Sequence, residues 1–188
     1  SGSTGGIYLT GDITKLDSEY ETFANGININ RSVSIYLEGH TITSDNGKVF
    51  NVDSTGSLSL YNGEVVADGT AAITNDGTVT VGLTTNFTNV GDYAIENNGR
   101  VSESSLTTFT QLSNLIALVS GGEVYIGSSK ITKADDEKEA FADGIVVEKD
   151  LTVTGYYNTY YKRIDTQIDA DGSGRIFAVN DGATLTLN

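Results

Sequence analysis

Four residue types are missing from this 188-residue chain: Cys, Met, Pro and Trp. The lack of cysteine excludes disulfide bonds, thiolate zinc sites, iron–sulfur clusters and cysteine nucleophiles. Histidine is nearly missing as well, because His40 is the single one in the chain. One chain therefore cannot build a metal site from several imidazoles.

Positive charge is scarce, since 11 Lys and Arg stand against 25 Asp and Glu and give a net charge of −14 at pH 7. A field of this sign repels phosphate backbones and anionic headgroups, so we expect no nucleic-acid partner. No apolar run approaches the ~18 residues of a transmembrane span, so we expect no membrane insertion of this segment. Residues 1–6 are small and polar, and we interpret them as a linker or an added start, with any targeting signal removed.

An internal repeat runs through the rest of the chain. Residues 47–61 align with residues 174–188 over 15 positions without a gap, and five positions are identical. The same register recurs at aliphatic anchors spaced 21 to 34 residues apart: Val33, Leu58, Val79, Val101, Val124, Leu151 and Leu185. Six positions before each anchor stands another aliphatic residue: Ile27, Val52, Ile73, Ile95, Leu118, Ile145 and Val179. Polar, glycine-prone turns lie between most of these pairs, which indicates a unit of strand, tight turn and strand.

A period near 22 residues, with slack at one place per turn, is typical of a right-handed parallel β-helix. We therefore predict an all-β fold, a solenoid of about 7–8 coils with corner insertions. Residues 7–188 form a single β-helix domain in this interpretation, which we expect to be a fragment of a longer solenoid. A β-sandwich is the alternative, but it does not explain the register from coil to coil.

Period-two alternation places both sets of aliphatic residues inside, as two buried ladders. Phe50 and Phe177 occupy the same repeat position and are predicted to match in burial. Glu103 is the one charged residue at an otherwise apolar position. Because a lone buried carboxylate is costly, we expect Glu103 to turn outward or to gain a hydrogen-bonding partner.

Other segments lie outside the ladders. Residues 16–25 are predicted to form a short helix capped by Asp17 or Ser18. The charged segment 132–143 is expected to be a solvated loop, although Phe141 could hold one helical turn over the solenoid. A row of tyrosines on successive coils is predicted to stack on the outer face: Tyr8, Tyr36 and Tyr61.

Several phrases of the repeat resemble a known class of proteins: residues 39–43, 47–52, 72–79 and 94–101. They are similar to the repeats of large extracellular β-helix surface proteins of bacteria, such as autotransporter passenger domains and repeat adhesins, within the pectate-lyase-like superfold. The resemblance implies an extracellular or bacterial cell-surface location and a role in adhesion or spacing. Fold alone does not fix function, so this step is an analogy.

The longest insertion, residues 155–173, is the predicted ligand-binding site. It gathers four tyrosines and two cations: Tyr156, Tyr157, Tyr160, Tyr161, Lys162 and Arg163. Exposed tyrosine offers contact area at low entropy cost, and a local positive pair in an acidic chain suits a host surface protein or an acidic glycan. The alternative is that these tyrosines pack over the solenoid flank, and both interpretations stay open.

A partial calcium loop follows the tyrosines. Oxygen ligands at alternating positions precede a glycine: Asp169, Asp171 and Ser173, then Gly174. The twelfth position is Asn180, which cannot supply a bidentate carboxylate. We therefore expect no cofactor beyond a weak Ca²⁺ site here, and an acidic turn between coils is the alternative.

Polysaccharide lyases and hydrolases share the predicted fold, and a glycosidase needs two carboxylates ~5–9 Å apart on one face. The outward position beside the anchors carries no pair of Asp residues, and His40 lacks partners that would make it a base. We predict that the chain is not an enzyme. The alternative is a carbohydrate-active β-helix, a phage tailspike or a polysaccharide lyase-like protein, with its catalytic residues outside this fragment or formed across subunits.

Overall fold

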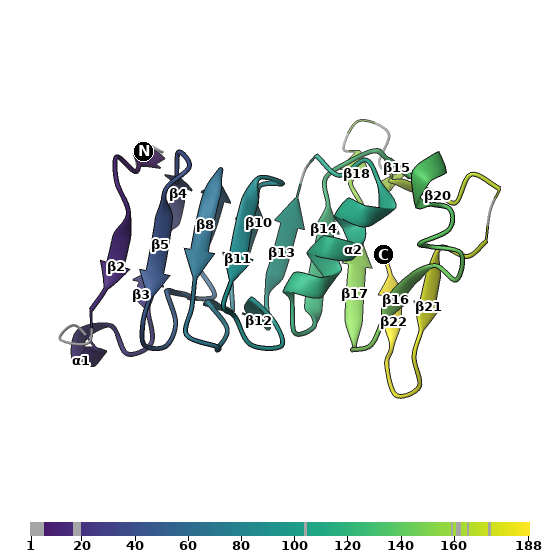
Figure 1. Ribbon diagram of the computed structural model, residues 1–188. Coiled ribbons are helices and arrows are strands. Elements are labelled where there is room, and N and C mark those ends of the chain that lie inside the picture. Colours follow the sequence, from purple (N-terminus) through teal and green to yellow (C-terminus); the bar gives the residue numbers. More distant parts are fainter. Residues whose placement is uncertain are drawn as a thin grey trace.

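Parallel strands stacked side by side form the body of the molecule in a computed structural model of the chain (Figure 1). The structure describes residues 6–16, 20–103, 105–158, 160, 163–164, 166–172 and 174–188. Its main sheet has eight strands, all paired in parallel, in this order: β1 (Gly6–Tyr8), β4 (Ser32–Tyr36), β7 (Ser57–Tyr61), β10 (Thr78–Val81), β13 (Arg100–Glu103), β14 (Gly122–Ile126), β17 (Leu151–Thr154) and β22 (Leu185–Leu187).

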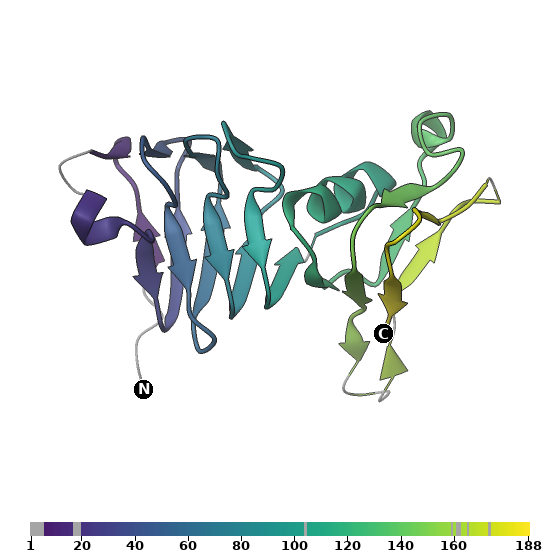
Figure 2. The ribbon, with the colours of Figure 1, turned by 90° about the horizontal axis from the view of Figure 1, so that it is seen from below.

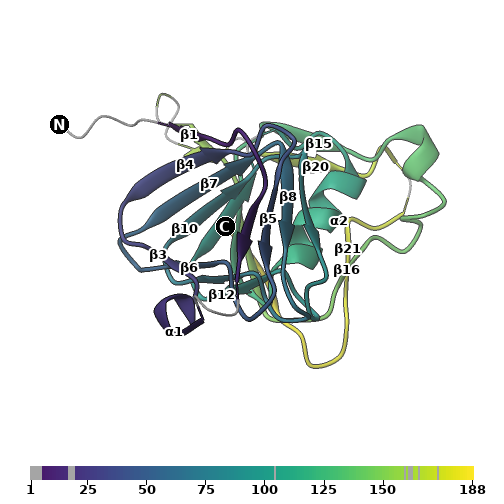
Figure 3. The same ribbon diagram turned by 60° about the vertical axis from the view of Figure 1, so that its left-hand side comes forward.

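Two further parallel sheets run along the same stack. The second sheet contains β11 (Thr85–Thr88), β8 (Gly63–Val66), β5 (Thr41–Ser44) and β2 (Ile13–Lys15). The third contains β12 (Ile95–Asn97), β9 (Ile73–Asn75), β6 (Phe50–Val52) and β3 (Ile27–Ile29). From β1 to β12, successive turns add one strand to each sheet in the same order, and the three sheets surround the interior (Figure 3). This mostly β, parallel arrangement is consistent with the predicted all-β parallel solenoid.

The remaining elements lie mainly in the second half of the chain. Two small parallel pairs are β15 (Lys130–Thr132) with β20 (Gln167–Asp169), and β16 (Ile145–Val147) with β21 (Phe177–Val179). An antiparallel pair joins β18 (Tyr157–Asn158) to β19 (Arg163–Ile164). The helices within the described residues are α1 (Tyr20–Phe23), α2 (Phe109–Leu118) and the 3₁₀ turn η2 (Asp135–Glu137). Among the described residues, no helix is long and apolar enough to span a membrane.

The anchor ladder forms largely as predicted. Neighbouring anchors pair in register along five strands: Val33, Leu58, Val79, Val101 and Val124. The register then shifts by two residues, because Val124 pairs with Val153 while Leu151 lies opposite Gly122. A register shift of two residues leaves each side chain on the same face of the sheet, so Leu151 is still buried. The end members Val33 and Leu185 are half-buried.

The other predicted ladder is confirmed at four positions that are fully buried: Val52, Ile73, Ile95 and Ile145. It is wrong at three. Ile27 and Val179 are 44% and 45% exposed, and they lie on β3 and β21, the first and last strands of this ladder, whereas β16, the strand of Ile145, also contacts α2. Leu118 is half-buried because the chain is helical there, and the next residue, Val119, takes the ladder position opposite Ile95.

The predicted match between Phe50 and Phe177 holds for position but not for burial. Phe50 pairs with Ile27 on one side and Ile73 on the other, and Phe177 pairs with Ile145. Phe50 is fully buried between two strands, whereas Phe177 is half-buried. The difference arises because β21 has a partner strand on one side only.

Two asparagines occupy the interior of the third sheet, where the sequence pattern indicated turns. Asn75 pairs with Val52 on one side and Asn97 on the other. Asn75 Nδ2 donates to Asn97 Oδ1 at 2.7 Å, and Asn97 Nδ2 donates to the Gly121 carbonyl at 2.8 Å. Both side chains are almost fully buried. The ladder continues through them because each amide finds a hydrogen-bonding partner.

The coil that contains Glu103 departs from the repeat. Glu103 stays inside, 4% exposed, and its Oε1 accepts a hydrogen bond from the Ser105 N–H at 2.6 Å. The predicted hydrogen-bonding partner is thereby confirmed. The chain then enters α2, which the repeat pattern did not predict. This helix starts with a capping box between Thr108 and Gln111.

The predicted tyrosine stack is confirmed. The ring centroids of Tyr8 and Tyr36 lie 4.6 Å apart at an interplanar angle of 8°, and those of Tyr36 and Tyr61 lie 5.1 Å apart at 22°. Gly82 follows Tyr61 in this row, and a Cβ at Gly82 would lie 2.9 Å from the Tyr61 ring. The faces of Tyr36 and Tyr61 are therefore covered, which makes this row part of the sheet's packing rather than a platform for a ligand.

Of the predictions for the two segments outside the repeat, one is confirmed and the other is wrong. The short helix predicted within residues 16–25 is present as α1, and its predicted caps Asp17 and Ser18 lie outside the described residues. The expectation of a solvated loop at 132–143 is wrong, because η2 forms there and Lys133 and Glu137 are buried. The helical turn is held over the solenoid partly by Phe141, as the sequence allowed.

Candidate functional site

The longest insertion forms a hairpin that leaves the parallel stack. In this hairpin Tyr157 lies opposite Ile164 and Asn158 opposite Arg163, with antiparallel pairing. Figure 2 shows the pair of strands, in yellow-green, extending away from the stacked sheets. Among the described residues β18 and β19 pair with each other and with no strand of the parallel sheets, so the insertion forms a separate small sheet instead of widening the solenoid.

Hydrogen bonds fasten the base of the hairpin to the stack. The Tyr156 N–H donates to Thr166 Oγ1 at 2.6 Å, and this hydroxyl donates to the Ser128 carbonyl at 2.9 Å. The Gly155 N–H donates to the Asn188 carbonyl at 2.9 Å. The hairpin is thus a projecting element on a fixed base, which is how binding loops are commonly presented on a rigid scaffold.

The structure places part of the predicted ligand-binding set on this hairpin. Tyr156 and Tyr160 are 38% and 84% exposed. Tyr157 and Arg163 belong to its two strands. Tyr161 and Lys162 lie outside the described residues. An exposure of 84% is incompatible with the packing interpretation for Tyr160, so the structure leaves at least this aromatic ring accessible.

The partial calcium loop is engaged in hydrogen bonds and ion pairs. Asp169 Oδ1 accepts from the Asp171 N–H at 2.9 Å, and Asp169 Oδ2 lies 3.3 Å from Lys130 Nζ. Asp171 Oδ2 lies 2.8 Å from Lys138 Nζ. The hydrogen bond from Asp171 and the Lys130 ammonium lower the pKa of Asp169. Ser173 lies outside the described residues, and the weak Ca²⁺ site stays a prediction.

Beneath this surface, two buried charges tie the insertions to the solenoid. Lys133 is 1% exposed, and its Nζ donates to the Phe141 carbonyl at 2.8 Å and lies 5.2 Å from the centre of the Phe109 ring. The carboxylate of Glu137 accepts from the N–H groups of Thr110 and Phe109, at the start of α2. A negative charge is favourable at a helix N-terminus, so Glu137 stabilises α2.

The pKa of Glu137 reflects this environment. Burial raises the pKa, but the hydrogen bonds from Thr110 and from the Ala134 and Phe109 N–H groups outweigh it and hold the pKa at about 2. The carboxylate is therefore charged at neutral pH, and its role is structural. Sequence reasoning missed both Lys133 and Glu137. A run of charged residues is expected to be exposed to solvent unless the backbone hydrogen-bonding groups that face it are known.

The described part of the chain holds no cluster of three or more His, Asp or Glu side chains placed to bind a metal ion. Comparison with known proteins finds no matching family model, no matching curated protein and no matching solved structure. What this molecule does must therefore be argued from its own scaffold and insertions.

Proposed function

We propose that this chain is a non-enzymatic binding or spacer module: a right-handed parallel β-helix of about seven to eight coils that is secreted or displayed on a bacterial surface. It binds a host surface protein or glycan through its corner insertions. The single observation that carries the proposal is the fastened hairpin, which extends away from the stacked sheets (Figure 2) and in which Tyr160 is 84% exposed. The repeat's resemblance to autotransporter passengers and adhesins supports the location.

The electrostatic setting favours the hairpin as the contact surface. The chain carries a net charge of −14, so most of its surface repels anionic ligands. Lys162 and Arg163 place two positive charges next in sequence to Tyr160 and Tyr161. Aromatic rings beside cations supply the contact area and the charge that an acidic glycan or protein needs.

The test replaces Tyr156, Tyr157, Tyr160 and Tyr161 together with Ser. We expect binding to host cells and to glycan or protein arrays to be lost, while the melting temperature stays nearly unchanged. Tyr8→Ser is a matched control, because Tyr8 is 61% exposed but belongs to β1 in the main sheet. Binding that survives the fourfold change, together with a lower melting temperature, would show that these tyrosines are packing residues. Release of new reducing ends from bound glycans would overturn the non-enzymatic assignment.

A further inference from the structure

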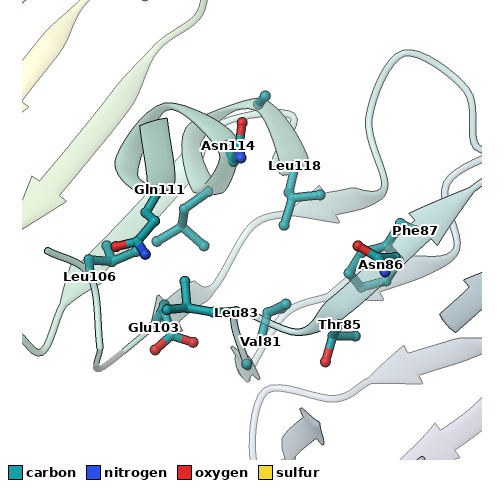
Figure 4. Close-up of a pocket in the computed structure, with 13 residues that line it drawn as sticks. Val81, Leu83, Thr85, Asn86, Phe87, Glu103, Leu106, Gln111, Asn114 and Leu118 are labelled. Atoms are coloured by element: carbon teal, nitrogen blue, oxygen red, sulfur yellow. The ribbon is translucent and has the colours of Figure 1, made fainter. Parts of the chain in front are cut away.

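A cleft lies where the second sheet stops. The order of that sheet ends at β11, and the following turn of the chain contributes α2 instead of another strand. Figure 4 shows the cleft between α2 and the segment that leads into β11. Its volume is about 400 Å³, which lies within the range of sites for small organic ligands.

The cleft contains a buried carboxylate. Glu103 lines it and is 4% exposed. One of its oxygens accepts from the Ser105 N–H, and the other has no hydrogen bond with the described part of the chain. A buried carboxylate with one neutral donor retains strong acceptor capacity, so a ligand hydroxyl entering the cleft would be held tightly.

Two side-chain amides add donors and acceptors. Gln111 Oε1 accepts from the Thr107 N–H at 2.7 Å and from the Thr108 N–H at 3.3 Å. These bonds fix the amide, so its Nε2 is left as the donor that lines the cleft. Asn114 stands one turn further along α2 at an exposed position of the cleft wall. The helix thus presents two amides at the spacing of its own turn.

The edge of β11 supplies backbone groups. The Gly63 and Ala67 N–H groups of the neighbouring turn donate to the carbonyls of Thr84 and Thr88. In a parallel ladder, alternate residues direct their backbone groups to opposite sides. The N–H and C=O of Phe87 therefore point away from β8, toward α2, where no strand pairs with β11 among the described residues.

Apolar side chains complete the walls. Leu83 is 46% exposed, and Leu118 is half-buried on α2. Both line the cleft, and Figure 4 shows them on opposite walls. Among the lining residues there is one carboxylate and no Lys, Arg or His. The site therefore combines apolar contact with neutral amides and a carboxylate, and it disfavours an anionic ligand.

We propose that this cleft binds a neutral sugar unit, with hydroxyls on Glu103, Gln111 and Asn114 and its C–H faces between Leu83 and Leu118. A sugar matches the site because it presents many hydroxyls and apolar faces without charge. This site is separate from the hairpin of the proposed function and does not depend on it. It would make the molecule a binder with two different surfaces, one aromatic and cationic and the other recessed and acidic.

The experiment titrates the full chain with a panel of neutral monosaccharides and disaccharides and with the matching uronic acids, using ligand-observed NMR and calorimetry. We expect saturable binding of at least one neutral sugar, and at least tenfold weaker binding of its uronic acid. Asn114→Ala and Leu83→Ser should each weaken binding at least tenfold, while Ser113→Ala, on the same helix outside the cleft, should change affinity less than twofold. Glu103→Gln tests the carboxylate directly.

Any one of three results would overturn the proposal. It fails if the folded wild-type chain binds no neutral sugar of the panel, if uronic acids bind as well as neutral sugars, or if Asn114→Ala and Leu83→Ser leave affinity unchanged. Both of these side chains lie at exposed or partly exposed positions, so thermal melting can verify that the variants fold. The fourfold Tyr→Ser variant should retain sugar binding in the cleft. Loss of sugar binding in that variant alone would assign the sugar to the hairpin.

Discussion

The interior is packed differently in the two halves of the molecule. The first half ends at β13, and the second half begins at α2. In the first half, like side chains stack on like: leucine and valine in the interior, asparagine on asparagine, tyrosine on tyrosine. In the second half, the chain inserts α2, η2 and the hairpin, and buries the charged residues Lys133 and Glu137. Regular ladders are stabilised by repetition, whereas each insertion needs hydrogen-bonding partners of its own.

This difference explains where ligand sites can arise. A ladder residue has neighbours above and below it, so changing it disturbs three coils at once. An insertion contacts the stack at a few fixed points, such as Thr166 for the hairpin and Glu137 for α2. The surface between those points can change without disturbing the ladders, so ligand sites are expected in or beside the insertions.

The largest expected effect is in the regular half. Leu58 is fully buried between Val33 and Val79, and Leu58→Ala should lower the free energy of unfolding by ~2–5 kcal/mol through lost contacts and a cavity. Leu118→Ala, at the half-buried wall of the cleft, should cost only about 1 kcal/mol. Urea denaturation followed by circular dichroism measures both. Equal costs at the two positions would contradict the distinction between ladder and insertion.

How far the sequence predicts the fold depends on the same distinction between ladder and insertion. Anchors such as Leu58 and Val79 are predictable because period-two alternation and a near-constant coil length both specify them. The shift at Leu151, which lies opposite Gly122, is not predictable, because a two-residue shift preserves the same inward pattern. Sequence alone also cannot show that Ile27 lies on the end strand of the third sheet and is exposed there.

The insertions at residues 132–143 and 155–173 are predictable in location but not in content, whereas α2 was not predicted at all. The sequence of α2 does contain a helix signal, the capping box of Thr108 and Gln111 followed by apolar residues at helical spacing. Sequence reasoning missed this signal because it assigned the same residues to the strand repeat. The aromatic residues of the hairpin were identified from composition alone. The cleft was not, because it depends on β11 ending its sheet beside a helix, which is a tertiary relation.

The next expected effect is pH-dependent and concerns the second half. Glu137 has an ordinary pKa of 4.5 that the fold lowers to about 2. Since the folded pKa is depressed, the stabilisation is fully present above pH 4.5 and is lost as the pH falls toward 2, by on the order of 3 kcal/mol. Glu137→Gln removes the charge and should destabilise the chain at pH 7.

The measurement compares unfolding of the wild type and of Glu137→Gln at pH 7, 4 and 3. We expect the difference in free energy between them to shrink as the pH falls, because below pH 4.5 the wild-type carboxylate takes up a proton in the unfolded chain while it stays charged in the folded one. Glu139→Gln is the matched control, since Glu139 is exposed two residues away, and it should differ little from the wild type at any of these values. A difference that stays constant with pH would show that the charge of Glu137 does not stabilise α2.

The smallest expected effect concerns the asparagine ladder of the regular half. Asn97→Ala removes the acceptor of Asn75 Nδ2 and the donor to the Gly121 carbonyl, both in the buried interior, and should cost about 1–3 kcal/mol. Asn98→Ala is the control, because Asn98 is exposed and bonded to Asp76 at the surface, and it should cost under about 0.5 kcal/mol.

A double-mutant cycle then tests whether the two amides act as one unit. Asn75→Ala and Asn97→Ala share the 2.7 Å hydrogen bond, so the double variant should cost less than the sum of the single variants, with a coupling of about 0.5–3 kcal/mol. Urea denaturation at pH 7 gives the four free energies of the cycle. Strict additivity would mean that each asparagine is held by its own backbone partners, such as Gly77 and Arg100 for Asn75 and Gly121 for Asn97, and that like side chains on neighbouring coils do not support one another.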